Sequence, residues 1–343
     1  MKITTIGLDI AKRAFQAHGV DASGRAVLRR KLGRSEVLGF FRALPPCLVG
    51  IEACGSAHHW AREIRALGHE VRLIPAAYVK PYVKRGKTDA ADAEAICEAV
   101  TRPTMRFVPI KTPEQQALLV LHRTRDLLVR QRTMLVNSLR GHLAEFGIVA
   151  RQGTGGMGEL LGILRDAAET RVPALARTAL LRLADAIEAI ETQVAEVEAA
   201  ILAWHKASEA SRRLAKVPGI GPITATAILA SVGDIANFRS ARHLAAWIGL
   251  VPKQDSTGGK PRQVGISKAG DRYLRKLLVL GATTVIRHNK NKAQEGWLAG
   301  LLARRPTMVA AIAQANKTAR IVWALLTRGG TYDPTLGRQA AAA

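Results

Sequence analysis

The stretch "ITTIGLDI", residues 3–10, decides the N-terminal fold, because a short run of β-branched and apolar residues carries an acid, Asp9, near its end. Such a run is typical of a buried strand. Outward from it, strands and helices are expected in the order β-β-β-α-β-α-β-α. The segments are 3–10, 14–21, 26–33, 35–44, 47–53, 57–68, 70–75 and 89–100. This order predicts one α/β domain over residues 1–105.

A second acid, Glu52, ends the fourth predicted strand, "CLVGIEA" at 47–53. Ionised carboxylates are rarely buried unless they are paired or bind a metal. In a ribonuclease-H-like sheet the first and fourth strands are neighbours, which would bring Asp9 and Glu52 together. Asp89 and Asp92 project from one face of the last helix, because they are three residues apart. The helix dipole alone could favour that pair, but it does not explain the two strand acids.

Four carboxylates in one place would repel one another, and a divalent cation relieves that repulsion. Oxygen ligands suit Mg²⁺ or Mn²⁺, and two such ions roughly 3.5–4 Å apart can hold the attacking and leaving oxygens of a phosphodiester. The sequence therefore predicts a Mg²⁺ site, which Mn²⁺ could also fill, at Asp9, Glu52, Asp89 and Asp92. His58 and His59 follow Glu52 closely, but their place at a helix start favours a surface role.

The charge balance points to a polyanionic partner. The chain has 343 residues with Lys+Arg 51 and Asp+Glu 27, a net charge of +24. Cations that neutralise phosphates gain free energy from counterion release. The start "KITTIGLDI" is unlike a signal peptide, and no apolar run approaches the ~20 residues of a membrane span. We therefore expect a cytoplasmic, nucleoid-associated protein with no membrane partner.

Basic and aromatic residues alternate just before the acidic helix, in "YVKPYVKRGKTD" at 78–89. This pattern suits a nucleic-acid strand led past a metal site, although a solvated charged loop would have the same composition. The nucleic-acid-binding candidates here are Lys80, Lys84, Arg85 and Lys87.

Residues 106–208 are expected to be helical, with a coiled coil. In "LLRLADAIEAIETQVAEVEAAILAW", residues 180–204, apolar residues recur at alternating spacings of three and four. The tract 113–147 repeats the pattern less cleanly. An intramolecular antiparallel hairpin would show the same pattern as an intermolecular coiled coil, so the pattern does not fix the number of chains. Between the tracts, the glycines of "RQGTGGMGE" at 151–159 predict a flexible connection rather than a phosphate loop, because no strand precedes them.

Glycine-rich turn chemistry marks a further region, 209–330, followed by a tail at 331–343. "KVPGIGPITATAILASVGDIANF", residues 216–238, resembles a helix-hairpin-helix motif, a common DNA-binding element. Gly219 and Gly221 would let backbone N–H groups at a helix start approach a phosphate closely. A tight helix-helix turn without DNA binding would need the same glycines.

Five stretches together resemble the Piv-like family of bacterial insertion-sequence transposases, the Asp-Glu-Asp-Asp recombinases. They are "GLDIAK" at 7–12, "GIEACGSAHHWA" at 50–61, "VKRGKTDAADAEAI" at 83–96, "VPGIGPITATAIL" at 217–229 and "AAWIGLVPKQDSTGGKPRQVGISKAGDRYLRKLL" at 245–278. The resemblance covers residues 1–330.

The resemblance implies a ribonuclease-H-like, resolvase-like domain whose acidic tetrad binds Mg²⁺ at Asp9, Glu52, Asp89 and Asp92. It implies a coiled-coil linker and a mainly helical transposase domain with a nucleophilic serine, here Ser256. It further implies DNA cleavage and exchange through a covalent phosphoserine intermediate at the element ends and target. A noncoding guide RNA, and homodimers that form tetramers on DNA, are implied as well.

Ser256 lies in "KQDSTGG", which alone is an ordinary turn. A serine hydroxyl must be activated to act as a nucleophile, for which a metal-bound carboxylate of the other domain is a candidate. Thr257 follows directly, where the family usually has glycine, so the choice between these two hydroxyls stays open. Six cations downstream, beside a single acid, Asp271, could position the phosphate. They are Lys260, Arg262, Lys268, Arg272, Arg275 and Lys276.

Two other function classes compete with a serine recombinase. One is a metal-dependent junction-resolving nuclease in which water attacks the phosphate. The other is a non-catalytic architectural protein, against which the four acids argue because they would repel phosphate without a metal. The change Asp9→Ala separates the three: it should abolish recombination, abolish hydrolysis, or leave DNA binding intact or tighter.

Overall fold

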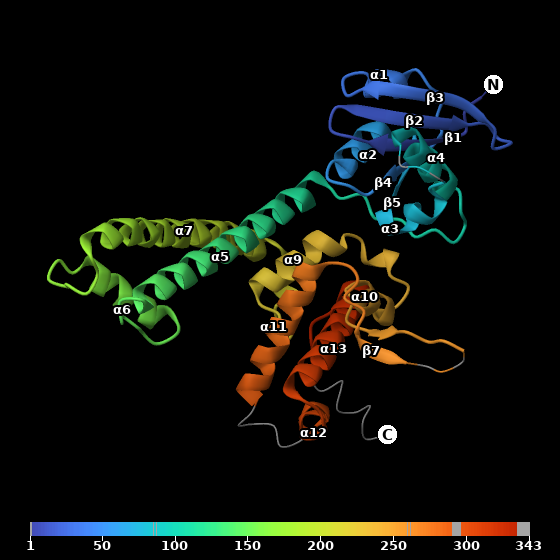
Figure 1. Cartoon of the computed structure of the whole chain (residues 1–343). Helices are drawn as coiled ribbons and strands as arrows, with labels where there is room; N and C mark the ends of the chain where they lie inside the picture. The colour runs from blue at the N-terminus through green and yellow to red at the C-terminus, as the bar shows by residue number, and fades with distance from the viewer. Residues whose placement is uncertain are drawn as a thin grey trace. The chain divides into compact units, whose positions relative to one another are not determined.

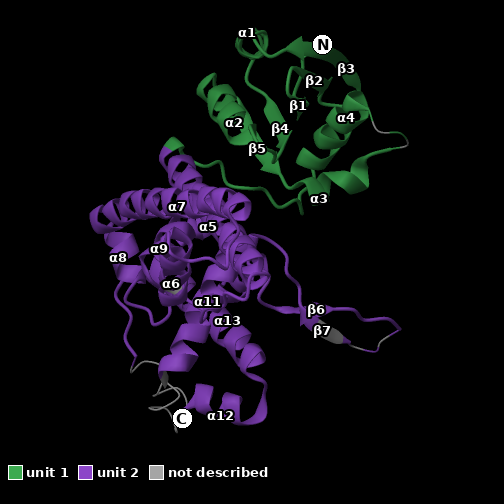
Figure 2. Ribbon diagram, turned by 60° about the vertical axis from the view of Figure 1, so that its left-hand side comes forward, with its two compact units in different colours: residues 1–113 green, residues 114–343 purple. Residues whose placement is uncertain are grey.

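The computed structural model describes residues 2–84, 86, 88–258, 260, 262–289 and 296–334. The chain divides into two compact units, residues 1–113 and 114–343 (Figures 1 and 2). Unit 1 is α/β and unit 2 is mainly helical, which confirms the mixed α/β and helical class. The finer division at residues 105, 208 and 330 stays a prediction, and residues 335–343 of the predicted tail lie outside the described part. No helix of the described chain is long and apolar enough to span a membrane.

Unit 1 is built on a five-stranded mixed sheet in the order β3-β2-β1-β4-β5. Strands β1 to β3 pair antiparallel, whereas β4 and β5 continue parallel to β1. The predicted order of strands and helices is confirmed, with two short helical segments, α3 and η1, added before α4. The elements are β1 (Thr5–Ile10), β2 (Ala14–Val20), β3 (Ala26–Gly33), α1 (Val37–Arg42), β4 (Leu48–Glu52), α2 (Ala57–Ala66), β5 (Glu70–Ile74), α3 (Ala76–Val79), the 3-10 helix η1 (Lys80–Tyr82) and α4 (Asp89–Val100).

The two faces of this sheet are covered by different helices (Figure 2). Ile6 and Leu8 of β1 pack in one core with α2 residues such as Trp60. The alternate residues of β1 and β4 lie on the other face of the sheet, against α4, and two of them are glycines. A Cβ atom on Gly7 would lie 2.1 Å from the Ala93 carbonyl oxygen of α4, and one on Gly50 would lie 2.7 Å from a Val100 side-chain atom. Both glycines therefore let α4 lie directly on β1 and β4.

Unit 2 combines a long helical hairpin with a compact helical body. The body has a continuous apolar core supplied by α8 to α11 and α13. The helices and strands are α5 (Pro113–Ala144), α6 (Thr154–Arg165), α7 (Ala174–Ala207), α8 (Glu209–Leu214), α9 (Pro222–Val232), the 3-10 helix η2 (Ile235–Asn237), α10 (Ala241–Trp247), β6 (Pro252–Gln254), β7 (Gln263–Ile266), α11 (Arg272–Asn289), α12 (Trp297–Arg304) and α13 (Thr307–Arg328).

Helices α5 and α7 pack antiparallel within the chain. Arg125 of α5 lies 2.6 Å from Glu198 of α7, and Arg132, seven residues further along α5, lies 4.0 Å from Glu191, seven residues back along α7. The predicted heptad residues of α7 at every seventh position are buried, namely Leu180, Ile187, Val194 and Ile201. The apolar seam is therefore that of an intramolecular hairpin, one of the two arrangements that the sequence left open.

The prediction of a flexible connection at the glycine-rich stretch is wrong, because α6 begins at Thr154 and includes Gly155, Gly156 and Gly158. A Cβ atom on Gly156 would lie 1.8 Å from the Arg151 carbonyl oxygen. This glycine thus serves close backbone packing at a helix start.

Candidate active site

The sheet brings Asp9 and Glu52 to adjacent strand ends. Leu8 of β1 pairs with Ile51 of β4 in parallel register, and the two acids are the next residues on their strands. Because side chains alternate along a strand, Asp9 shares the face of Gly7 and Glu52 that of Gly50. This is the face on which α4 packs.

The start of α4 brings the other two acids to the same face. The Thr88 hydroxyl accepts the N–H of Ala91 at 3.2 Å and so caps the helix. The cap fixes the helix start at Asp89, which places Asp89 and Asp92 in the first turn. Asp89 is exposed and Asp92 is half-buried.

The two strand acids, Asp9 and Glu52, have raised pKa values. Burial and then Asp92, Asp89 and Glu52, in that order, raise the pKa of Asp9 to about 6. Burial and then Asp92 raise the pKa of Glu52. As the side chains stand, no three acids, histidines or cysteines of the described residues converge closely enough to hold a metal ion. The all-oxygen donor set nonetheless fits a hard divalent cation in its chemistry.

His58 and His59 both lie in the first turn of α2. His58 accepts the backbone N–H of Lys111 at its Nδ1 atom, at 3.2 Å. His59 is exposed, and its Nδ1 lies 3.9 Å from the Glu63 carboxylate. The surface role expected from their helix position therefore describes His59 best.

The basic segment before α4 is tied to that helix. Lys84 lies 2.5 Å from the Glu94 carboxylate of α4, and this ion pair raises the pKa of Lys84 and lowers that of Glu94. Lys80 is exposed in η1. Arg85 and Lys87 lie outside the described residues.

Ser256 lies in the loop between β6 and β7, which pair antiparallel (Figure 2). The N–H of Asp255 donates to the Arg262 carbonyl at 2.9 Å, and the N–H of Lys260 donates to that of Thr257 at 3.1 Å. Ser256 and Thr257 are both exposed. The Ser256 hydroxyl makes no hydrogen bond to another described residue, so a nucleophilic role would require activation from elsewhere.

The cations downstream of Ser256 separate into two groups. Lys260, Arg262, Lys268 and Arg272 are exposed. Arg275 instead donates to the carbonyls of Ile248 and Ala269, at 2.8 and 2.7 Å. Lys276 lies 2.9 Å from the Asp126 carboxylate of α5. Arg275 and Lys276 therefore hold the fold of unit 2, whereas the first four remain candidates for phosphate contact.

The two glycines of the α8–α9 turn have different surroundings. Gly219 has φ +86°, and a Cβ atom there would lie 2.9 Å from the Gly281 carbonyl oxygen of α11. Packing against α11 thus accounts for Gly219. Gly221 is the N-cap residue of α9, and a Cβ atom there would meet open space. Phosphate approach at this helix start stays a prediction.

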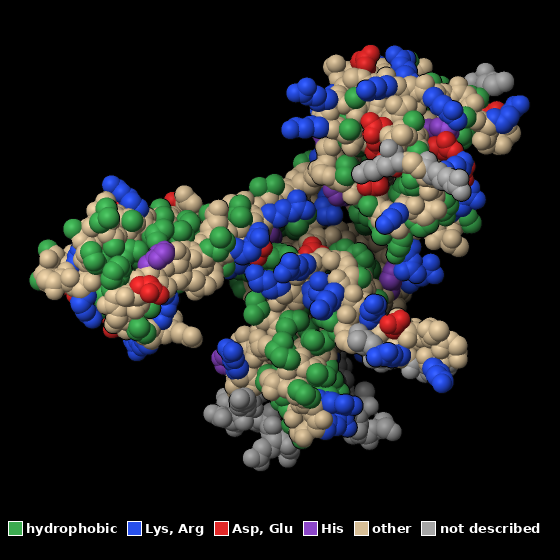
Figure 3. Space-filling model, in the orientation of Figure 1, with side chains coloured by type: hydrophobic (Ala, Val, Ile, Leu, Met, Phe, Trp, Pro, Cys, Tyr) green, Lys and Arg blue, Asp and Glu red, His purple; other side chains and the backbone are tan. Residues whose placement is uncertain are grey.

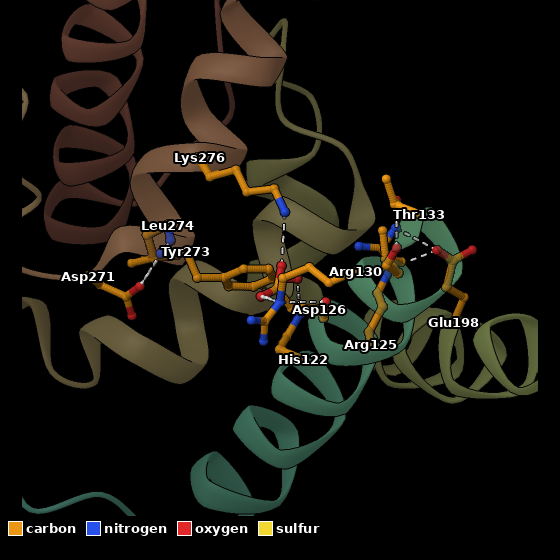
Figure 4. A network of polar contacts seen from close by, with 11 residues as sticks. His122, Arg125, Asp126, Arg130, Thr133, Glu198, Asp271, Tyr273, Leu274 and Lys276 are labelled. Atoms are coloured by element: carbon orange, nitrogen blue, oxygen red, sulfur yellow. Dashed lines mark hydrogen bonds and ion pairs between the residues drawn. The ribbon is translucent and has the colours of Figure 1, made fainter. Parts of the chain in front are cut away.

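Sequence reasoning missed a polar network around His122 of α5 (Figure 4). The ring is 1% exposed and contacts the Tyr273 hydroxyl of α11 and the Thr226 hydroxyl of α9. Burial, and then Arg125, lower the pKa of His122 to about 4. The available signal was a histidine inside the apolar tract "LLVLH" at 118–122.

Comparison with known proteins places both parts of the chain in one group. Residues 6–148, which include the four acids, match the IS110-type Asp-Glu-Asp-Asp transposase model, described as "Transposase". Residues 211–297, which include Ser256, match the "Transposase IS116/IS110/IS902 family" model.

Three relatives match over nearly their whole length. A "Probable family 20 transposase" of Pseudomonas aeruginosa is 52% identical, over 97% of this chain and 100% of the relative. The "Transposase for insertion sequence element IS1111A" of Coxiella burnetii is 42% identical, over 96% and 91%. The corresponding protein of element IS1328 of Yersinia enterocolitica is 40% identical, over 96% and 99%.

The acid-bearing α/β unit, the helical unit and these full-length matches together define a DNA transposase. The chain belongs to the IS116/IS110/IS902 family of insertion-sequence transposases. The Asp-Glu-Asp-Asp type of its first unit implies a divalent metal.

Proposed function

We propose that this transposase cleaves and joins the DNA of its element through a covalent bond to Ser256, with Mg²⁺ or Mn²⁺ on Asp9, Glu52, Asp89 and Asp92. The observation that carries the proposal is the position of four carboxylates on one sheet face, where burial and then the three neighbouring acids raise the pKa of Asp9. The strand order β3-β2-β1-β4-β5, with the acids on β1, β4 and α4, supports a ribonuclease-H-like identity for this unit.

Unit 1 contributes position and charge. Gly7 and Gly50 let α4 lie directly on the sheet face that carries Asp9 and Glu52, and the first turn of α4 carries Asp89 and Asp92. When bound by these carboxylates, the cation would polarise the phosphate and stabilise its developing negative charge. The repulsion between the four acids favours cation binding, because it is relieved only when positive charge arrives.

Unit 2 contributes the nucleophile. The Ser256 Oγ atom would attack the phosphorus, so that an Oγ–P bond forms while the bond from phosphorus to a deoxyribose oxygen breaks. The serine proton is lost to a base, and the departing oxygen takes up a proton. Attack by a DNA hydroxyl on the phosphorus would then break the Oγ–P bond and release Ser256. The number of phosphodiester bonds is therefore the same before and after the exchange. Lys260, Arg262, Lys268 and Arg272 are exposed and would hold phosphate oxygens.

The proposed partners are the DNA of the element ends and target, together with a noncoding guide RNA from the element. We propose that the protein acts in the cytoplasm, at the nucleoid, as dimers that pair into tetramers on DNA. The net charge of +24 supports nucleic-acid binding, and Lys and Arg side chains are spread over the visible surface of both units (Figure 3). Lys80, Lys84, Arg85, Lys87 and the Gly219–Gly221 turn remain the candidate contacts.

The test is to incubate the purified protein with Mg²⁺, labelled DNA spanning the joined element ends and RNA from the element flanks. We expect a protein–DNA adduct that survives denaturation. Ser256→Ala and Asp9→Ala should each abolish it, whereas Thr257→Ala should preserve it. An adduct lost in Thr257→Ala but kept in Ser256→Ala would move the nucleophile to Thr257.

A junction-resolving nuclease gives a different result in the same assay. DNA would then be cleaved without any adduct, unaffected by Ser256→Ala and lost in Asp9→Ala. That outcome would replace Ser256 with water as the nucleophile and leave the role of the acids intact.

A further inference from the structure

His122 joins three helices of unit 2 through both of its ring nitrogens (Figure 4). Its Nδ1 atom lies 3.2 Å from the Tyr273 hydroxyl of α11, and its Nε2 atom lies 3.1 Å from the Thr226 hydroxyl of α9. A second link runs beside it, because Asp126, one turn further along α5, pairs with Lys276 of α11 at 2.9 Å. The first turn of α11 is thus held to α5 at two successive points.

One tautomer of His122 satisfies all the hydrogen bonds around the ring. The Thr226 hydroxyl donates within its own helix, to the Pro222 carbonyl at 2.8 Å, so it accepts from the Nε2–H of His122. The Nδ1 atom then accepts from the Tyr273 hydroxyl. A neutral ring with one donor and one acceptor satisfies both contacts. Hydrogen bonds of this kind fix the rotation of α11 about its axis, which non-directional apolar packing would leave less constrained.

The first turn of α11 also packs against the base of the β6–β7 hairpin, whose loop carries Ser256. We call this base, the segments 247–251 and 267–270, the hairpin root. Arg275 of α11 holds the carbonyls of Ile248, before β6, and Ala269, after β7. The N–H of Ser267 donates to the Val251 carbonyl at 2.8 Å and closes the hairpin at its base.

The backbone on the two sides of this root is in direct contact. A Cβ atom on Gly270 would lie 1.8 Å from the Trp247 carbonyl oxygen, and one on Gly249 would lie 2.3 Å from that of Ala269. There is no room for a side chain to separate the segments. The hairpin root and the first turn of α11 are therefore packed directly together.

We propose that His122 is a positioning residue for the transposition reaction, which fixes the Ser256 hairpin by holding the first turn of α11 against α5 and α9. This proposal rests on the proposed role of Ser256. His122 would contact neither DNA nor metal, and it acts through Tyr273 and the hairpin root. Its loss should therefore slow the chemical step while leaving DNA affinity unchanged.

The first experiment separates binding from chemistry with His122→Phe, His122→Gln and Tyr273→Phe. Phenylalanine fills the space without either hydrogen bond, whereas glutamine retains one donor and one acceptor. We expect His122→Phe to lower the single-turnover rate of adduct formation about 10- to 100-fold, because small misplacements of a reacting group have effects of this size. DNA affinity should stay within about twofold, and His122→Gln should recover most of the rate.

His205→Phe is the matched control. His205 lies 2.7 Å from the Ser211 hydroxyl through its Nδ1 atom, a contact that joins α7 to α8 rather than to α11. The variant His205→Phe should leave the rate of adduct formation unchanged. If His122→Phe does not fold, Tyr273→Phe still carries the test, because it removes a single hydroxyl. An adduct rate within about twofold of the wild type in both variants would overturn the proposal, since lost positioning affects the chemical step.

A second readout does not depend on the nucleophile. Hydrogen exchange at the N–H groups of Ser267 and Lys268, which close the hairpin root, should accelerate about tenfold or more in His122→Phe and stay unchanged in His205→Phe. If the wild type forms no adduct, the phosphoserine proposal fails, and exchange alone decides whether His122 holds the hairpin. Unchanged exchange in His122→Phe would overturn the positioning role.

Discussion

The half-buried Asp9 of unit 1 and the buried His122 of unit 2 have opposite surroundings. In unit 1, burial and then the charges of three other carboxylates raise the pKa of Asp9 to about 6. In unit 2, His122 is neutral, its pKa is lowered to about 4, and both ring nitrogens have partners. The surroundings of Asp9 therefore leave repulsion between carboxylates in place, whereas the surroundings of His122 satisfy both of its ring nitrogens. From this difference we expect the acidic site to bind a cation and the His122 contacts to hold helices together.

Asp9→Asn tests the unit 1 side of this comparison and should have the largest effect. Strand cleavage should fall by at least about 100-fold, since removing a charge-stabilising group from an active site has effects of this size. Without metal, the same variant should unfold at a higher temperature than the wild type, because one of four repelling charges is removed. A cleavage assay measures the first change, and thermal unfolding with and without Mg²⁺ measures the second against Asp185→Asn, a change at an exposed carboxylate of α7. A variant less stable than the wild type without metal would contradict the repulsion.

The pH dependence of His122 tests the unit 2 side. Between pH 6.5 and about 4 the unfolded histidine binds a proton that the folded one does not, so stability falls as the pH is lowered through this range. The full loss is about 3 kcal/mol, reached near pH 4 and constant below it. Urea unfolding of wild type and His122→Gln at several pH values measures the difference in slope. Equal slopes would show that His122 does not titrate in this way.

Gly7→Ala should disturb the acidic site, which combines Asp9 and Glu52 of the sheet with Asp89 and Asp92 of α4. The new Cβ atom would lie 2.1 Å from the Ala93 carbonyl, so α4 must move away from β1. We expect a loss of about 1–3 kcal/mol of stability, the usual cost of overpacking, together with weaker Mg²⁺ binding. Gly55→Ala is the control, because a Cβ atom there meets open space. Unchanged Mg²⁺ affinity in Gly7→Ala would show that α4 need not lie so close to the sheet.

Lys84→Met should have the smallest effect on folding. Lys84 is exposed and pairs with Glu94 at the surface, and exposed ion pairs contribute little to stability. We expect an unchanged unfolding temperature but weaker DNA binding with a shallower salt dependence, since one phosphate contact is lost. DNA binding by Glu94→Gln should be unchanged or tighter, which separates the loss of the cation from the loss of the ion pair. Unchanged salt dependence in Lys84→Met would remove this residue from the nucleic-acid surface.

The features predicted from sequence were those with a local signal. Asp9 interrupts a strand pattern, and the spacing of Asp89 and Asp92 is visible in a helix of any fold. The seating of α4 was not predictable, because Gly7 and Gly50 matter only once a helix packs against them. Tyr273 lies 151 residues from His122, and no local pattern joins positions so distant. The wrong prediction of a flexible connection at Gly156 has the same cause, since this glycine is needed for close packing against the Arg151 backbone.

The antiparallel pairing of α5 and α7 also sets a length. At 1.5 Å per residue, the 34 residues of α7 extend about 51 Å, close to the rise of 15 base pairs of B-form DNA at 3.4 Å each. Because the seam repeats every seven residues and the helices run in opposite directions, the hairpin can be shortened only by removing matched heptads from both. Each such pair would shorten the arm by about 10 Å and keep the apolar residues in phase. The length of the hairpin can therefore change only in steps of one heptad.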